Sequence, residues 1–309
     1  MDESLNARPA GRTAPPAPRK APLRLMERVM QLLFLFCGLV AVAFVLFISF
    51  YLVLSGLPAI REIGLGDFLL GRTWASTAAE PAFGILPFIL TSVYGTAGAI
   101  LLGVPVGFLT AVFLAKVAPP RVAALVRPAV DLLAGIPSVV YGLIGMMVLV
   151  PAVRELFHLP DGASLFCAML VLAVMILPSI ISVSETALRA VPREYEEASL
   201  ALGATEIETY FRVSVPAAKS GIAASIVMGI GRAIGEAMAV IMVAGNVANM
   251  PSLFASVRFL TTAVASEMSY AAVGSLQQQA LFSIALVLFL FIMLINVLLN
   301  LLLKWKREK

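Results

Sequence analysis

Six apolar runs, each long enough to cross a lipid bilayer, constrain what this chain can fold into. A membrane-spanning helix needs about 20 predominantly apolar residues. The six runs cover residues 29–55, 88–115, 129–151, 165–188, 220–244 and 280–303. Hydrophobic residues make up 61% of the 309 residues and charged residues only 13%, whereas a soluble domain is about 45–50% apolar and about 25% charged. We therefore predict an all-α membrane protein with six transmembrane helices.

The distribution of Lys and Arg along the chain predicts the orientation of these helices. Of the 22 Lys and Arg residues, 17 lie in the terminal segments and in alternate connections, namely 1–28, 116–128, 188–219 and 304–309. The other connections (56–87, 152–164 and 245–279) hold four, and Arg232 lies inside a run. Because cytoplasmic segments carry the excess of Lys and Arg, both termini are expected in the cytoplasm.

Composition also suggests the organisation of the chain. Residues 1–28 are rich in Pro, Ala and Arg and show no periodicity, so we expect a disordered cytoplasmic tail. Residues 29–303 form the expected six-helix domain, with a core at about 88–303 and a polar loop at 189–219. Residues 304–309 form a basic cytoplasmic C-terminus.

The polar loop contains the stretch "EEASLALGATEIETYFRVSVP", residues 196–216, between two apolar runs. Pro192 suits the first position of a helix, and Gly203 suits the end of one. Thr205 and Glu208 have the spacing of a capping box, which predicts a second short helix ending at Pro216. The loop is therefore expected to be a compact pair of helices.

Two roles fit such a loop. One is a docking surface for another protein, because ordinary connections are only about 4–6 residues long. The other is an amphipathic helix lying on lipid headgroups. The acidic residues Glu194, Glu196 and Glu197 favour the first role, since headgroup-bound helices are rich in Lys and Arg.

The amino-acid sequence of this loop resembles a motif of a known family. Glu197-Ala198-Ser199, Gly203 and the segment 213–216 ("VSVP") are similar to the "EAA…G…I-x-LP" loop of ABC importer permeases. Ser199 and the two valines of "VSVP" are mild departures from that pattern. The resemblance implies a type I ABC importer architecture with a cytoplasmic coupling-helix loop. It also implies that Glu197, Ala198, Gly203 and Pro216 contact a separate ATPase subunit.

A second candidate site lies inside the fifth run, in "GRAIGEAMAV". Arg232 and Glu236 are expected near the middle of this helix, one helical turn apart on the same face. Placing either charge at the centre of a membrane helix costs about 2.5–3.5 kcal/mol. One interpretation is an ion pair that holds the bundle together. The other is a polar station on an anion pathway, because a guanidinium binds phosphate oxygens in a bidentate manner.

Three longer segments narrow the resemblance. "PAFGILPFILTSVYGT", "LAGIPSVVYGLIGMMVLVP" and "GIGRAIGEAMAVIMVAGN" resemble the PstC-type permeases of phosphate ABC importers from about residue 80 to residue 250. The resemblance implies a role in phosphate translocation for Arg232 and Glu236, which pair with each other or with a partner subunit. The implied partners are a PstA-like permease, a PstB-like ATPase dimer that holds ATP and Mg, and an extracytoplasmic phosphate-binding protein. The implied location is the bacterial inner membrane.

Several other functions are disfavoured by the sequence. No Gly-Lys dipeptide exists, so the chain has no phosphate-binding loop of its own and no bound cofactor is expected. Two separate cysteines (Cys37 and Cys167) and one histidine (His158) predict no metal site. The sequence contains no nucleophile–base combination or set of metal ligands, so an enzyme is not expected. The net charge of +4 is too small to suggest a nucleic-acid partner. A permease for sulfate or molybdate remains an alternative, as does a stand-alone secondary transporter.

Overall fold

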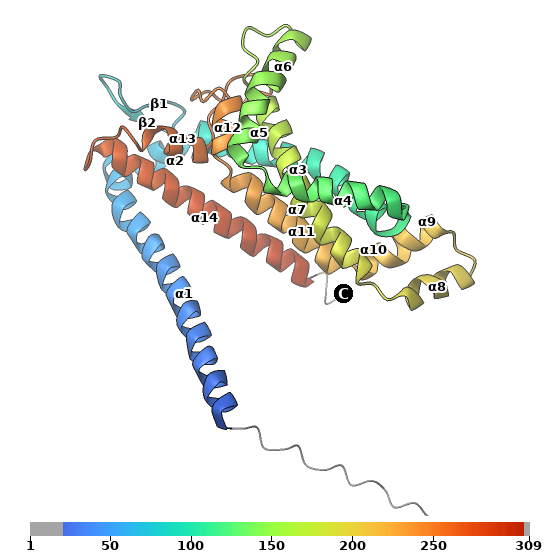
Figure 1. Ribbon diagram of the computed structural model, residues 1–309. Helices are drawn as coiled ribbons and strands as arrows, with labels where there is room; N and C mark the ends of the chain where they lie inside the picture. Colours follow the sequence, from blue (N-terminus) through green and yellow to red (C-terminus); the bar gives the residue numbers. More distant parts are fainter. Residues whose placement is uncertain (1–20, 306–309) are drawn as a thin grey trace, which may run out of the picture. The chain divides into compact units, whose positions relative to one another are not determined.

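The structure, a computed structural model, describes residues 21–305 and is helical throughout apart from turns, loops and one short hairpin (Figure 1). The hairpin pairs β1 (Trp74–Ala75) with β2 (Ala82–Phe83) in antiparallel fashion. The predicted all-α fold is therefore confirmed.

The chain divides into two compact units, residues 1–51 and 52–309, and the boundary falls within the long helix α1 (Ala21–Ile63). The part of α1 in the first unit carries mostly exposed apolar side chains, a surface suited to lipid. Because α1 begins at Ala21, residues 21–28 of the expected disordered tail are helical. Residues 1–20 of that tail, and residues 306–309 of the basic C-terminus, lie outside the described residues.

The second unit consists of helices that alternate between long membrane-length segments and short polar ones. Its elements are α2 (Leu65–Leu70), α3 (Leu86–Val112), α4 (Pro120–Gly135), α5 (Ser138–Ile144), α6 (Val150–Leu156), α7 (Leu165–Arg189), α8 (Arg193–Ala201), α9 (Glu206–Thr209), α10 (Val215–Ala217), α11 (Lys219–Gly235), α12 (Met238–Val243), α13 (Leu260–Glu267) and α14 (Leu276–Trp305). Three π-helical turns extend these helices: η1 (Phe113–Val117), η2 (Gly145–Leu149) and η3 (Tyr210–Ser214).

Within the described residues, five helical segments are long and apolar enough to cross a membrane. They are Met26–Ile63, Leu86–Val117, Ser138–Leu156, Leu165–Arg189 and Leu276–Leu298. A sixth is present if the bent pair Glu206–Ala217 and Lys219–Gly235 counts as one span. The chain is thus a multi-pass membrane protein, and the predicted number of six is reached with α11 as the additional segment.

The third predicted span is misplaced. Residues 129–151 were expected to form one helix, but α4 ends at Gly135 and a new helix begins at Ser138. The physical reason is Pro137, which has no N–H to donate and forces the preceding Ile136 into an extended conformation (φ −70°, ψ 127°). The membrane-length helix therefore runs from Ser138 to Leu156.

The centre of the second unit is the packing of α3 and α11 against α7 (Figure 1). Cβ atoms placed at Gly103 and Gly107 would meet the side chains of Ile176 and Ile180 of α7 at 2.8 and 3.0 Å, so a larger residue would require those side chains to shift. Glycines spaced four apart thus allow the backbones of α3 and α7 to approach each other closely. Within α11, Gly231 and Gly235 have no described atom near the corresponding Cβ positions.

Candidate functional site

The fifth predicted span is broken at the candidate charged site. The helix α11 ends at Gly235, and Glu236 adopts an extended conformation (φ −76°, ψ 124°) before α12 begins at Met238. Arg232 and Glu236 therefore do not share one helical face, and the predicted continuous helix over residues 220–244 is wrong. Among the described residues, no ion pair within 4.0 Å joins the two side chains.

Glu236 is instead engaged by the backbone on the far side of the break. Its Oε1 accepts a hydrogen bond from the Ala239 N–H at 3.1 Å, at the start of α12. A carboxylate in this position is favoured by the dipole of the helix that it caps. Its main-chain carbonyl accepts a hydrogen bond from Thr261 Oγ1 at 3.0 Å, which replaces one bond lost where the helix stops.

Arg232 stands in the last turn of α11 and is half-buried. In the described part of the chain, its guanidinium has no hydrogen-bond or ion-pair partner. The neighbouring Tyr141 hydroxyl, on which the Arg232 charge acts, is occupied: it donates to the Leu133 carbonyl at 2.7 Å. The guanidinium therefore has five N–H donors free for a ligand, at a point where the membrane helix is interrupted.

The predicted helical pair of the coupling loop, residues 189–219, is present. The first helix is α8, and Gly203 follows it in a left-handed conformation (φ 89°) that favours glycine. Thr205 and Glu208 form the predicted capping box at the start of α9. Pro216 does not end the second helix, which continues to Ala217 before a bend of 73° into α11.

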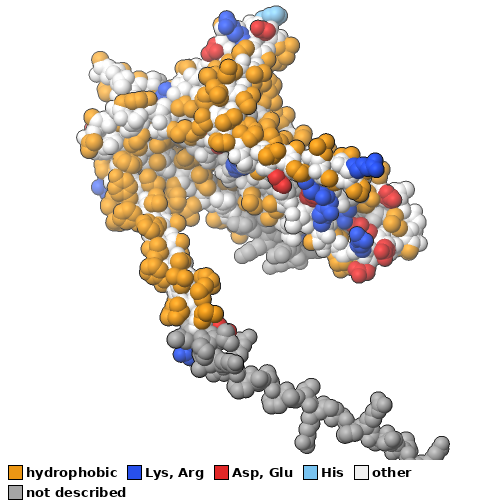
Figure 2. All heavy atoms as spheres, viewed as in Figure 1, with side chains coloured by type: hydrophobic (Ala, Val, Ile, Leu, Met, Phe, Trp, Pro, Cys, Tyr) orange, Lys and Arg blue, Asp and Glu red, His pale blue; other side chains and the backbone are white. Residues whose placement is uncertain are grey.

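The four predicted contact residues of this loop, Glu197, Ala198, Gly203 and Pro216, are all exposed. Two large apolar side chains beside them are also exposed, Leu202 at 90% and Ile207 at 68%. Figure 2 shows charged side chains gathered at this end of the second unit. Exposed apolar groups within a charged rim are typical of a protein–protein interface.

One glutamate of the loop faces inward and anchors it, which the sequence did not reveal. Glu196 Oε1 forms an ion pair with Lys116 Nζ at the end of the α3–η1 helix and accepts a hydrogen bond from Ser214 Oγ at 2.7 Å. Partial burial alone would raise the pKa of Glu196, but the hydrogen bonds from Lys116 and Ser214 and the charges of Lys116 and Arg193 lower that pKa below its usual value. The loop is thus fastened to α3 and to its own second helix.

A second cluster of charges fastens α4 to α7. Glu185 Oε1 accepts hydrogen bonds from Arg127 Nε at 2.6 Å and from Arg189 Nε at 2.8 Å. Both guanidiniums also donate to the Leu114 carbonyl, at 3.3 and 2.9 Å. The cluster borders a cavity of about 350 Å³ that Asp131 also lines. Lys116 and Arg127 are cations near the ends of apolar segments, but nothing in the sequence identified their partners.

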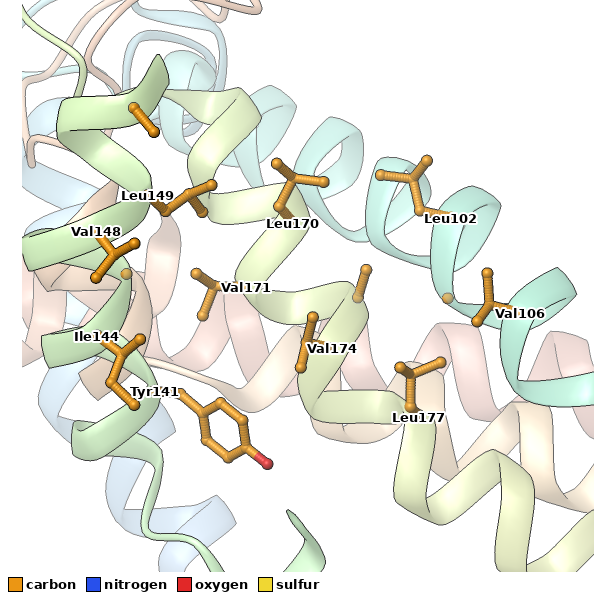
Figure 3. Close-up of a pocket in the computed structure, with 14 residues that line it drawn as sticks. Leu102, Val106, Tyr141, Ile144, Val148, Leu149, Leu170, Val171, Val174 and Leu177 are labelled. Atoms are coloured by element: carbon orange, nitrogen blue, oxygen red, sulfur yellow. The ribbon is translucent and has the colours of Figure 1, made fainter. Parts of the chain in front are cut away.

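A groove between the long helices of the second unit does not suit an anion. It has a volume of about 550 Å³ and lies between α3, α5–α6 and α7 (Figure 3). Its lining is almost wholly apolar, including Leu102, Val106, Ile144, Val148, Leu170, Val174 and Leu177. Its polar side chain, Tyr141, donates its hydroxyl to the Leu133 carbonyl, so the groove has little to offer an anion. Within residues 21–305, no three His, Cys, Asp or Glu side chains come together to hold a metal ion.

Comparison with known proteins identifies the class. The helical fold and the charged break define a multi-pass membrane protein of the permease type. Residues 103–308 match the family described as "Binding-protein-dependent transport system inner membrane component", and the chain belongs to this family. Membership in a transport family agrees with the expectation of a non-catalytic subunit.

Curated relatives match most of the chain. The probable ABC transporter permease protein YqgH of Bacillus subtilis is 39% identical, covering 84% of this chain and 86% of its own length. The phosphate transport system permease protein PstC of Haemophilus influenzae is 35% identical, covering 80% and 83%. The probable PstC of Methanocaldococcus jannaschii is 30% identical, covering 84% and 87%.

Solved structures share the fold at low sequence identity. A chain of the inward-facing MetNI methionine ABC transporter matches with a TM-score of 0.57 at 18% identity, covering 71% of this chain and 94% of its own. A chain of a bacterial alginate ABC transporter, solved with an alginate-bound periplasmic protein, matches with a TM-score of 0.56 at 16% identity, covering 91% and 96%. These matches confirm the predicted type I ABC importer architecture.

Proposed function

We propose that the chain is the transmembrane permease subunit of an ATP-driven importer of inorganic phosphate. The observation that carries the proposal is Arg232, a guanidinium without a partner in the described chain, placed where a membrane helix is interrupted. Such a group binds a phosphate oxyanion with two parallel hydrogen bonds. The relatives named PstC, which match four-fifths of this chain, support phosphate as the anion.

Glu236 has a supporting role in this proposal. Its carboxylate is held by the Ala239 N–H, so it stands near Arg232 in sequence but does not neutralise it. A fixed negative charge there weakens the attraction of the site for an anion and favours release over tight binding. A protonated phosphate oxygen can also donate a hydrogen bond to this carboxylate.

The proposed partners are supported by the exposed residues of the coupling loop and by the family of the chain. The coupling loop offers Glu197, Ala198, Gly203 and Pro216 to a PstB-like ATPase dimer, which supplies ATP and Mg. A PstA-like second permease completes the pathway, and the open space beside Gly231 and Gly235 of α11 suits its close approach. An extracytoplasmic phosphate-binding protein delivers the anion. The proposed location is the bacterial inner membrane, with both termini in the cytoplasm.

The function is tested by phosphate uptake in cells that lack their own phosphate importers. The chain is expressed with its partner subunits, which include either the active ATPase or an inactivated variant of it. Uptake of radiolabelled phosphate is then compared between the two complexes. We expect ATPase-dependent uptake that excess sulfate or molybdate does not inhibit. Inhibition by sulfate or molybdate, with weak phosphate uptake, would identify a permease for another oxyanion. Uptake that persists with the inactive ATPase would identify a secondary transporter.

A further inference from the structure

A short helix, α13, links the break in the fifth span to the β1–β2 hairpin. Near its N-terminus, buried Thr261 donates its hydroxyl to the Glu236 carbonyl at 3.0 Å. At its C-terminus lies Glu267, whose side chain is only 12% exposed. The helix is eight residues long, about 12 Å from end to end. It therefore connects two sites that lie far apart in the sequence.

Glu267 receives hydrogen bonds from three separate segments. Trp74 Nε1 and Ser76 Oγ, from the hairpin, donate to it at 2.9 Å each. Gln277 Nε2, from the first turn of α14, donates at 3.3 Å, and Arg258 forms an ion pair with it. A carboxylate satisfied from several sides holds its donors in one arrangement, because each unmade bond would leave a buried polar group unpaired.

Arg258 extends this network to the far end of α12. Its Nε and NH2 groups donate to the Asn246 carbonyl at 3.0 and 2.8 Å, and its guanidinium lies 5.9 Å from the centre of the Phe88 ring. Asn246 follows α12 in a left-handed conformation (φ 53°). The segment from the break to Asn246 is thus held at both ends by groups that belong to α13 or contact it.

A further hydrogen bond joins α13 to the bundle. The Leu260 N–H donates to Ser92 Oγ of α3 at 3.0 Å, so the start of α13 cannot move without α3. The hairpin end has its own apolar packing, because Trp74 contacts Phe83 and Phe88 with ring centres 5.5 and 5.6 Å apart. The hairpin and α13 also share one buried apolar cluster, which includes Trp74, Phe83, Leu260 and Ala263. The hydrogen bonds of Glu267 and Thr261 add directional contacts between the hairpin, α13 and the break.

We propose that Thr261 and Glu267 are positioning residues that set the geometry of the break and, through it, the placement of Arg232. Among the described residues, neither side chain forms a hydrogen bond or an ion pair with Arg232. Thr261 fixes the carbonyl of Glu236, and Glu267 fixes the helix that carries Thr261. The inference that these residues position the break is drawn from the contacts just described. Its consequence for anion transport depends on the proposed function.

The test measures the accessibility of the break directly. Met238, exposed just after the break, is changed to cysteine in a complex whose Cys37 and Cys167 are replaced by alanine. The rate of labelling by a small charged thiol reagent is then compared in Thr261→Val and Glu267→Gln variants. Thr110→Val, whose hydroxyl bonds only to Val106 of its own helix, and Glu155→Gln, an exposed carboxylate on α6, are the matched controls.

We expect Thr261→Val to raise the labelling rate about fivefold, the factor that the loss of one hydrogen bond produces in an equilibrium constant. Glu267→Gln should raise it at least as much, and the controls should stay within about twofold. In the double variant, the rate should equal that of Glu267→Gln alone, because one link is broken twice. Ser76→Ala, which removes one donor and no buried charge, should act in the same direction in a fully folded complex.

Two results would overturn the proposal. One is labelling of all variants at the control rate. The other is a double variant whose effect is the product of the single effects, which would indicate two independent structural contacts. The labelling needs no phosphate, so a failure of phosphate uptake would refute the proposed function and leave this test intact.

Discussion

Two charged sites in the apolar bundle, Glu185 and Arg232, have opposite surroundings. The Glu185 carboxylate is 10% exposed and accepts hydrogen bonds from Arg127 and Arg189, which also share the Leu114 carbonyl. Arg232 is half-buried and has no such partner within the described residues. The charge of the first site is paired and fastens helices together, whereas the guanidinium donors of the second have no partner among the described residues.

Under the proposed function, this difference separates a site that serves stability from one that serves transport. A charge placed in a membrane helix costs about 2.5–3.5 kcal/mol, and partners such as those of Glu185 offset that cost. An unpartnered charge within a membrane segment is a candidate for a substrate pathway. In the proposed function, Arg232 is the group that binds the anion, and we expect its unpartnered charge to contribute nothing to the stability of the isolated chain.

The largest expected effect separates the two sites by transport. Arg232→Gln should reduce phosphate uptake per assembled complex about 10- to 100-fold, because charge-assisted hydrogen bonds contribute about 1.5–3 kcal/mol. Glu185→Gln should leave uptake per complex within about twofold. Radiolabelled uptake, normalised to the amount of co-purified ATPase, makes the comparison. Equal losses at both positions would erase the distinction between the sites.

The next prediction concerns stability, for which substitution of Glu185 should have the larger effect and substitution of Arg232 the smaller one. Glu185→Gln should destabilise the protein by about 1–2 kcal/mol, because it leaves two arginines sharing one weaker acceptor. This range is reduced because Arg127 and Arg189 are 39% and 46% exposed and water screens them. Arg232→Gln should not destabilise it. Thermal unfolding of the purified complex tests both, with Glu155→Gln as the surface control.

A smaller effect is expected on ATPase binding by the coupling loop, where Glu196, like Glu185, is paired with a cation. Lys116→Met should weaken retention of the ATPase several-fold, because the loop loses one of its two anchors. Co-purification of the ATPase with wild-type and variant chains measures this effect. Arg121→Met, an exposed change in the same connection, is the control and should retain the ATPase.

The pH dependence of this anchor follows from the lowered pKa of Glu196. A carboxyl with a lowered folded-state pKa contributes stability that is fully present above its unfolded-state pKa and is lost as the pH falls through the folded value. Retention of the ATPase in the wild type should therefore be constant at neutral pH and decline only below about pH 4, given an ordinary Glu pKa of about 4.3. Loss of retention near pH 6 would contradict the assignment.

The smallest effects concern the turn between α8 and α9. Gly203→Ala should reduce the free energy of unfolding of the loop by about 1–2 kcal/mol, because the φ of 89° is unfavourable for a residue with a Cβ atom. Thr205→Ala should cost about 1 kcal/mol through loss of the capping box. Both should lower ATPase retention slightly and leave phosphate affinity unchanged. Titration of ATPase binding against loop variants measures the first effect, and uptake at varied phosphate concentration measures the second.

Local features of the site were predictable from the sequence, whereas its geometry was not. The capping box of Thr205 and Glu208 was predicted because both partners lie within three residues. The Arg232 and Glu236 pair was predicted on a continuous helix, but α11 ends at Gly235. Thr261, 25 residues away, supplies a hydrogen bond at that break, and periodicity carries no information about such a contact.

By itself the sequence determined the class of protein, since apolar runs of bilayer length and clustered Lys and Arg follow from the energetics of lipid transfer alone. It also determined the helical pair of the coupling loop. Only the tertiary structure decided which charges have partners. The contact of Trp74 with Glu267 spans 193 residues, and that of Lys116 with Glu196 spans 80. Such contacts depend on how the helices pack. Only the fold therefore shows that Glu185 is paired and that Arg232 has no partner among the described residues.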